Sequence, residues 1–186
     1  MARIFVFLIS LLLMSPPAMA REMNGVTMPD QITLGESTLQ LNGMGLRKKL
    51  WIKVYVAGLY LEQKSHNPEE IYKMPGKKRL EMHFLTNKAN KGKMDSAWEE
   101  GFKKNSPELF EKLRPRINKF RDFFGDMHKG DVLALTFLPG QGVQAEYNGE
   151  VKGTIEGADF ATALLRVWFG PHPPGGDLKK GLLGEK

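Results

Sequence analysis

The stretch LWIKVYVAGLYL, from Leu50 to Leu61, is the strongest structural signal in the sequence. Aromatic and β-branched residues dominate it, as is typical of β-strands. Successive side chains of a strand point to opposite faces of a sheet, and here both sets are largely apolar. We therefore predict a central strand that is covered on both sides.

Further strand patterns lie on either side of this stretch. We predict strands at Ile32–Leu34, Thr38–Leu41, Arg79–Leu85, Asp131–Phe137, Gln144–Tyr147 and Val151–Ile155, the last two joined by the hairpin signal Asn148-Gly149. Helical patterns begin at Asn67-Pro68 and at Ser106-Pro107, and others span Lys91–Lys104, Gly157–Phe169 and Asp177–Leu183. Pro115 interrupts the helix that begins at Ser106, so we expect a kink or two abutting helices there. This order predicts one α+β domain, an antiparallel β-sheet with a layer of helices on it.

The N-terminus has the pattern of a cleavable signal peptide. Arg3 precedes the apolar stretch Ile4–Met14, and Ala18-Met19-Ala20 is the small-x-small motif of a cleavage site. The alternative is a retained membrane anchor, but the apolar stretch is much shorter than the roughly 20 residues that cross a bilayer. We predict that residues 1–20 are a signal peptide and that residues 21–186 are a periplasmic or secreted domain.

The composition excludes several classes of function. The chain has no cysteine, which rules out a lipoprotein anchor, disulfides, thiol catalysis and thiolate metal sites. The net charge of +6 could attract anionic ligands or lipids, but the basic residues are interspersed with 21 acidic ones, which favours a role in solubility. Export argues against a nucleic-acid partner, and no later segment is apolar enough for a stable membrane span.

No motif predicts a metal or a cofactor. The four histidines are scattered, and no pair has the spacing of a helical metal site. Gly43-Met44-Gly45 lacks the third glycine of a dinucleotide fingerprint, so we assign it to backbone flexibility at a strand turn. Arg47 and Tyr55 could together hold the acidic head of an apolar molecule. Spacing alone favours the alternative that Arg47 lies in a solvated turn and Tyr55 in the core.

Two segments resemble the chalcone isomerase superfamily. The first is Gly43-x-Gly45-x-Arg47 followed by Lys53–Glu62, and the second runs from Ile155-Glu156-Gly157 to Trp168-Phe169-Gly170. The resemblance extends from about Gly25 to Leu183 and is greatest to the exported bacterial chalcone isomerase-like proteins. It implies the chalcone isomerase-like fold, in which an apolar cleft lies between a large antiparallel sheet and a layer of helices.

The resemblance also assigns roles to residues. Arg47 matches the arginine that binds and polarises the substrate in the plant enzyme, whose reaction is an intramolecular ring closure. Tyr55 replaces a threonine of the enzyme, and the fatty-acid-binding members pair the arginine with a tyrosine. The catalytic tyrosine and asparagine belong on the stretch Thr86–Met94, which contains no tyrosine. A late-helix threonine or serine of the enzymes matches Ala161, next to Thr162.

These matches predict a non-catalytic periplasmic binding protein for a fatty acid or similar amphipathic carboxylate, with no cofactor. Its predicted ligand-binding residues are Arg47, Tyr55, Trp51, Leu59, Phe84, Met94, Trp98 and Leu164, with Trp168 as further lining. One alternative is an isomerase or intramolecular lyase with Arg47 as the catalytic residue, and another is a structural or interaction module of the cell envelope. Eight residues of straight strand span roughly 26 Å, so a hairpin or sharp bend near Lys48-Lys49 must bring Arg47 and Tyr55 together.

Overall fold

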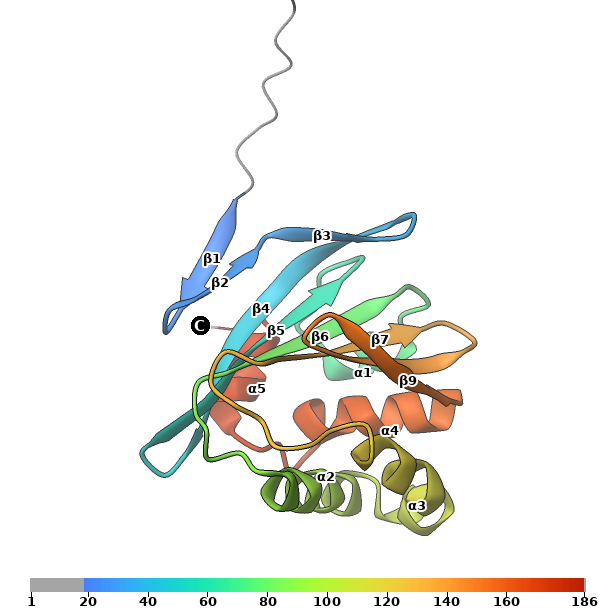
Figure 1. The fold of residues 1–186 in the computed structure, drawn as a ribbon. Coiled ribbons are helices and arrows are strands. Elements are labelled where there is room, and N and C mark those ends of the chain that lie inside the picture. The colour runs from blue at the N-terminus through green and yellow to red at the C-terminus, as the bar shows by residue number, and fades with distance from the viewer. Residues whose placement is uncertain (1–18, 186) are drawn as a thin grey trace, which may run out of the picture.

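The computed structural model describes residues 19–185, which form nine strands and five helices (Figure 1). The strands are β1 (Ala20–Met23), β2 (Val26–Pro29), β3 (Gln31–Leu34), β4 (Ser37–Lys49), β5 (Ile52–Leu61), β6 (Lys78–Phe84), β7 (Val132–Leu138), β8 (Gly142–Tyr147) and β9 (Glu150–Glu156). The helices are α1 (Pro68–Lys73), α2 (Lys91–Asn105), α3 (Pro107–Arg121), α4 (Ala158–Phe169) and α5 (Gly176–Leu182). The apolar stretch of the predicted signal peptide lies outside the described residues, so cleavage near Ala20 stays a prediction. None of the helices within residues 19–185 is long and apolar enough to cross a membrane.

Strands β3 to β9 form one sheet in which every neighbouring pair is antiparallel and the spatial order equals the chain order. Strands β1 and β2 form a separate two-stranded ribbon. The helices lie on one side of the curled sheet, with α2, α3 and α4 in a layer and α5 against β4 (Figure 1). The predicted α+β class, an antiparallel sheet with a layer of helices, is confirmed.

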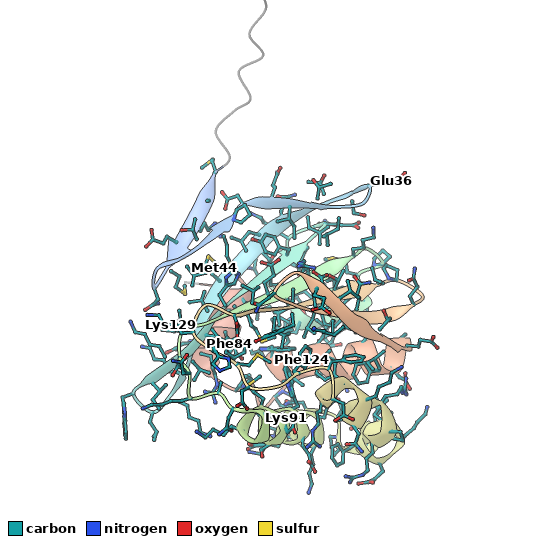
Figure 2. All side chains as sticks on the ribbon, in the orientation of Figure 1. Glu36, Met44, Phe84, Lys91, Phe124 and Lys129 are labelled. Carbon is teal, nitrogen blue, oxygen red and sulfur yellow. The ribbon has the colours of Figure 1, made fainter. Side chains whose placement is uncertain are left out.

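Strand β5 is buried on both faces, as predicted. Every residue from Tyr55 to Leu61 is buried. Alternate residues starting at Tyr55 face the helical layer, whereas Val56 and Tyr60 pack on the opposite face under β2. Figure 2 shows the two sides of the sheet, with Met44 on the side of the β1–β2 ribbon and Phe84 on the side of the helices.

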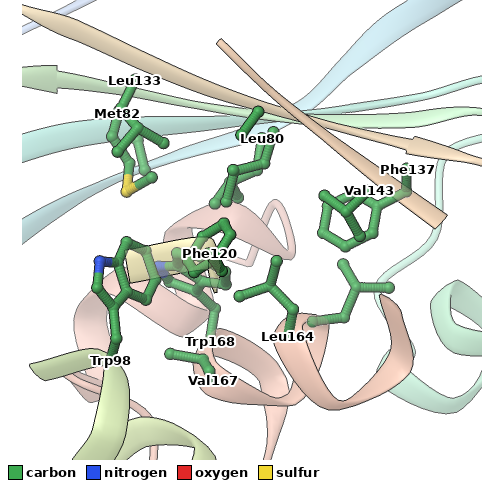
Figure 3. Close-up of a cluster of buried hydrophobic side chains, with 14 of the residues drawn as sticks. Leu80, Met82, Trp98, Phe120, Leu133, Phe137, Val143, Leu164, Val167 and Trp168 are labelled. Carbon is green, nitrogen blue, oxygen red and sulfur yellow. The ribbon is translucent and has the colours of Figure 1, made fainter. Parts of the chain in front are cut away.

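The main hydrophobic core lies between the sheet and helices α2, α3 and α4 (Figure 3). Leu80 and Met82 of β6 face Trp98 of α2 and Leu164 and Trp168 of α4, and all five side chains are buried. Full burial of one large apolar side chain stabilises a fold by roughly 1.5–3 kcal/mol. Since the chain has no cysteine, this burial carries the stability of the domain without cross-links.

Helix α3 runs through Pro115 as one helix, so the expectation of two abutting helices is wrong. Pro115 cannot donate a main-chain hydrogen bond, but it lies on the exposed side of the helix. The apolar stripe of α3 places Leu113 and Ile117 in the core on either side of the proline. Packing of this stripe therefore keeps the two halves in one continuous helix.

Candidate functional site

A cavity of about 690 Å³ lies between the β4–β5 hairpin, the start of α2 and the end of α4. Its size is within the usual range of small-molecule sites, about 300–1,000 Å³. The lining comes from four places. The hairpin contributes Arg47, Lys49, Leu50, Ile52, Val54 and Tyr55, and the sheet adds Met82. The segment from the end of β6 through α2 contributes Thr86, Lys88, Ala89, Asn90, Gly92, Lys93, Met94, Ser96, Ala97, Trp98 and Glu100. The end of α4 and the loop after it contribute Val167, Trp168 and Pro174.

Arg47 and Tyr55 are direct partners across the β4–β5 hairpin. The two-residue turn Leu50–Trp51 brings them together, and both side chains line the cavity. Opposed residues of an antiparallel pair have Cβ atoms roughly 5 Å apart, so one ligand head can contact both. The predicted hairpin is confirmed.

Gly43 and Gly45 give α5 the space to pack directly on β4. A Cβ atom at Gly43 would lie 2.1 Å from the carbonyl oxygen of Gly181, and one at Gly45 would lie 2.5 Å from that of Leu178. Both distances are far below a van der Waals contact. The glycines therefore serve close packing in the middle of a strand, and the expectation of flexibility at a turn is wrong. This packing supports the strand that carries Arg47.

The Tyr55 hydroxyl can act as a hydrogen-bond donor to a ligand. It accepts a hydrogen bond from Nε1 of Trp168 at 3.3 Å, which leaves its own hydrogen free. Burial raises the pKa of the Tyr55 phenol, while the Trp168 hydrogen bond and the Arg47 charge oppose that rise without reversing it. The phenol is therefore protonated at neutral pH.

Trp98 brings a second donor to the cavity wall. Its side chain is buried, and its Nε1 has no hydrogen-bond partner within residues 19–185. The rings of Trp98 and Trp168 are edge-to-face with centroids 5.6 Å apart. Figure 3 shows the Trp98 nitrogen at the edge of the apolar cluster, pointing away from Leu164. The indole N–H is thus an unsatisfied donor buried in the wall of the cavity.

The cavity is rich in positive charge. Its four cationic lining residues are Arg47, Lys49, Lys88 and Lys93. In the described part of the chain none of them forms an ion pair, and Arg47 donates only to the main-chain carbonyl of Lys48. Glu100 is the acidic residue of the lining, and it pairs with Lys104 at 2.5 Å. The arrangement favours an anionic ligand.

No group of three metal-binding side chains is present within residues 19–185. The histidines instead make local contacts. His66 is hydrogen-bonded to the carbonyl of Leu183, and His83 lies 3.5 Å from the carboxylate of Glu81. None of the four histidines lines the cavity.

The structure brings together only some of the residues predicted from the sequence. Arg47, Tyr55, Met94, Trp98 and Trp168 line the cavity. Trp51 does not, because it occupies the hairpin turn with 83% of its side chain exposed. The other three predicted residues, Leu59, Phe84 and Leu164, are completely buried in the core and do not line the cavity either.

Several lining residues were missed. Strand β5 has a bulge, because Arg47 pairs with Tyr55 but Lys48 pairs with Lys53. Val54 is the extra residue, and it lines the cavity together with its neighbour Tyr55. No pattern in the sequence marks this bulge. Apart from Met94, the segment Thr86–Met94 was noted only for its missing tyrosine, yet it forms one wall of the cavity.

The late-helix position matched to the enzymes lies elsewhere. Ala161 and Thr162 line a separate, smaller pocket between α4 and the end of β7. The residues of α4 that reach the main cavity are Val167 and Trp168, near the C-terminal end of the helix. The absence of a hydroxyl at Ala161 therefore has no direct effect on this cavity.

A curled antiparallel sheet with a layer of helices is the chalcone isomerase-like fold. The chain belongs to the chalcone isomerase-like family, whose model matches residues 20–184. A solved structure with the same fold is the fatty-acid-binding protein AtFAP1 of Arabidopsis thaliana, with a TM-score of 0.71 and 17% sequence identity over 89% of this chain and 96% of that one. None of the curated proteins matches the chain.

Proposed function

We propose that this protein binds a fatty acid or a similar amphipathic carboxylate in the cavity without transforming it. The observation that carries the proposal is the pairing of Arg47 with the protonated Tyr55 in a largely apolar cavity. The carboxylate would accept hydrogen bonds from the guanidinium and the phenol, and the acyl chain would lie against Met94, Trp98 and Val167. The fatty-acid-binding protein with the same fold supports this class of ligand.

Binding is favoured over ring-closure chemistry by the polar groups of the lining. A catalyst of the chalcone isomerase type needs groups that orient and protonate its substrate. Asn90 uses its side chain to cap α2, where it accepts from the main-chain N–H of Lys93 at 3.1 Å. The raised pKa of Tyr55 makes the phenol a weaker acid, and therefore a poorer proton donor for such a reaction. The third alternative, a structural module, would have its cleft filled by its own side chains, whereas this domain has a cavity of about 690 Å³.

The proposal is tested by titrating laurate into the protein in a calorimeter. A charge-assisted hydrogen bond contributes about 1.5–3 kcal/mol net, so Arg47→Ala should weaken laurate binding roughly 10- to 150-fold. Lys48→Ala is the matched control, because Lys48 is the exposed neighbour of Arg47 and does not line the cavity. Its affinity should equal that of the wild type.

Two results would contradict the proposal. One is the absence of any laurate binding by the wild type, and the other is equal binding by wild type and Arg47→Ala. A chalcone cyclisation rate that falls in Arg47→Ala would favour the isomerase instead. The export predicted from residues 1–20 would make this a periplasmic binding protein, which fractionation of the host cells tests.

A further inference from the structure

The tip of the β4–β5 hairpin combines exposed apolar side chains with lysines. Leu50 is 78% exposed and Trp51 is 83% exposed, and they are neighbours in the two-residue turn. Within residues 19–185 the other exposed large apolar side chains are Met19, at 75%, and Val151, at 53%, each far from this turn in the sequence. The hairpin extends beyond the sheet and the helices at the lower left of Figure 1. An exposed leucine and tryptophan at a protruding tip require an explanation.

The charged side chains of the hairpin tip itself are all basic. Lys48, Lys49 and Lys53 are exposed next to the turn. Lys48 and Lys53 are direct cross-strand partners, an arrangement that places two like charges opposite each other. No acidic residue occurs between Glu36 and Glu62. The tip therefore carries positive charge that the hairpin itself does not neutralise.

The first position of the turn is occupied by an unusual residue type. The first residue of a two-residue hairpin turn commonly has a positive φ, which favours glycine or asparagine. Here that residue is Leu50, with φ of 56°. A large apolar side chain thus occupies a position where a small one would be easier to accommodate.

We propose that the hairpin tip docks on an anionic lipid membrane, with Leu50 and Trp51 inserted at the headgroup level and the lysines bound to lipid phosphates. Tryptophan is enriched at the membrane interface because its ring is amphipathic. Lysine stems can lie along apolar surface while the ammonium groups reach the headgroups. Short basic segments are attracted to anionic leaflets. The mixture of exposed apolar groups and cations fits this surface.

The position of the tip connects docking to the cavity. Lys49, Leu50 and Ile52 belong both to the end of the hairpin and to the cavity lining, and the exposed Lys88 and Lys93 lie on the opposite wall. A docked protein would therefore have the opening of its cavity at the membrane surface. Together with the proposed function, on which this step rests, docking would let an amphipathic acid pass between the bilayer and the cavity without crossing water.

Vesicle co-sedimentation tests the docking. The protein used begins at Met19, the first of the described residues, so that the apolar stretch Ile4–Met14 cannot itself bind lipid. The thermal unfolding of this shortened protein is compared with that of the full chain. The vesicles contain phosphatidylglycerol and phosphatidylcholine in equal parts, or phosphatidylcholine alone. Wild type should bind the anionic vesicles more tightly, and Trp51 fluorescence should be quenched by brominated lipid.

Two tip variants and one control complete the experiment. Trp51→Ser should weaken binding to anionic vesicles about tenfold, and Leu50→Asn/Trp51→Ser should weaken it further, because large apolar side chains no longer enter the interface. Asparagine is chosen at position 50 because it tolerates a positive φ. Val151→Ser is the matched control, an apolar side chain of β9 that is 53% exposed and outside the cavity lining. It should bind like the wild type.

The outcomes separate docking from ligand binding. Failure of the wild type to bind anionic vesicles, or equal binding by wild type and the double variant, overturns the docking proposal. Trp51→Ser should bind laurate in solution as the wild type does, since Trp51 does not line the cavity. Loss of vesicle binding by Trp51→Ser, with normal laurate binding, supports docking. Vesicle binding by a wild type that does not bind laurate contradicts only the proposed function.

Discussion

Trp98 has a buried indole N–H without a hydrogen-bond partner in the described part of the chain. A buried donor left unsatisfied costs roughly 1–3 kcal/mol. The ring is nevertheless held firmly, since it packs edge-to-face against both Phe120 and Trp168. We infer that the donor becomes satisfied when a ligand acceptor in the cavity displaces the groups that cover it. On this view Trp98 contributes to the recognition of the acid and not only to apolar lining.

Replacement of Trp98 by phenylalanine should weaken laurate binding about 3- to 15-fold, because one net hydrogen bond of about 0.5–1.5 kcal/mol is lost. Calorimetry measures the affinity. NMR provides a separate readout, because the protein has three indole N–H groups, those of Trp51, Trp98 and Trp168. Laurate should shift the Trp98 signal strongly and leave the Trp51 signal unchanged. Saturating laurate without a shift of the Trp98 signal would show that its N–H does not meet the ligand.

At the scale of elements, ion pairs join α3 to the start of α4, where Asp159 contacts Arg116 closely and lies 3.6 Å from the more exposed Lys112. Arg116 of α3 binds Asp159, in the first turn of α4, through two hydrogen bonds of 2.7 Å each. Arg116 also donates to the carbonyl of Glu156 at 2.9 Å. The Arg116 guanidinium holds the pKa of Asp159 well below its ordinary value of 3.8. The negative charge also lies at the N-terminal end of a helix, where the helix dipole stabilises it.

This pair should make stability depend on pH. The pKa of Asp159 is lower in the folded state than its unfolded value of 3.8. The carboxylate therefore contributes fully to the free energy of unfolding above this unfolded value, and the contribution is lost progressively as the pH falls towards the folded pKa. Asp159→Asn should reduce the free energy of unfolding by about 1 kcal/mol at neutral pH. The difference from the wild type should shrink below about pH 4. Denaturant titrations at a series of pH values measure it.

Glu111→Gln is the control for this prediction. Glu111 binds Arg114 on the same helix α3, but both side chains are largely exposed. Exposed pairs contribute little, so the unfolding free energy of Glu111→Gln should be close to that of the wild type at every pH. A pH-independent effect of Asp159→Asn would indicate that the ion pair is not its cause.

At the scale of the whole molecule, the cavity joins parts of the chain that are far apart in the sequence. Tyr55 of β5, Met94 of α2 and Val167 of α4 lie on three of its walls. A ligand in contact with all three stabilises the folded state only, because the unfolded chain has no such site. Bound laurate should therefore raise the stability of the entire domain.

Thermal unfolding should reveal this linkage. At a laurate concentration about 100 times the Kd, the stabilisation is about 2.7 kcal/mol. For a domain of this size, that corresponds to a rise in Tm of roughly 5–10 °C. Methyl laurate, which lacks the charge for Arg47, should produce a much smaller rise in Tm. Equal rises in Tm for the acid and the ester would mean that the carboxylate is not recognised.

Much of the secondary structure could be predicted because its signals are local. The period-two pattern of β5, the Asn67-Pro68 start of α1 and the Asn148-Gly149 hairpin all correspond to elements of the structure. Pro115 misled the prediction for α3, because the apolar stripe on both sides of it outweighs the lost hydrogen bond. Local patterns fail where packing by distant residues decides the outcome.

The candidate site illustrates the same limit. Strict alternation assigns Trp51 and Lys53 to the face of Tyr55. The bulge at Val54 reverses the alternation near the turn, so that Ile52 and Val54 line the cavity in their place. A single extra residue in one strand exchanges the two faces, and sequence periodicity cannot reveal it.

The sequence by itself determined the α+β class, the buried central strand β5 and the family resemblance that pairs Arg47 with Tyr55. Only the tertiary structure decided which side chains enclose the cavity, why Gly43 and Gly45 are required against α5, and that Leu50 and Trp51 remain exposed. The physical reason is the range of the interactions. Strand and helix patterns arise within a few residues, whereas the cavity and the hairpin tip depend on register and on packing between distant segments.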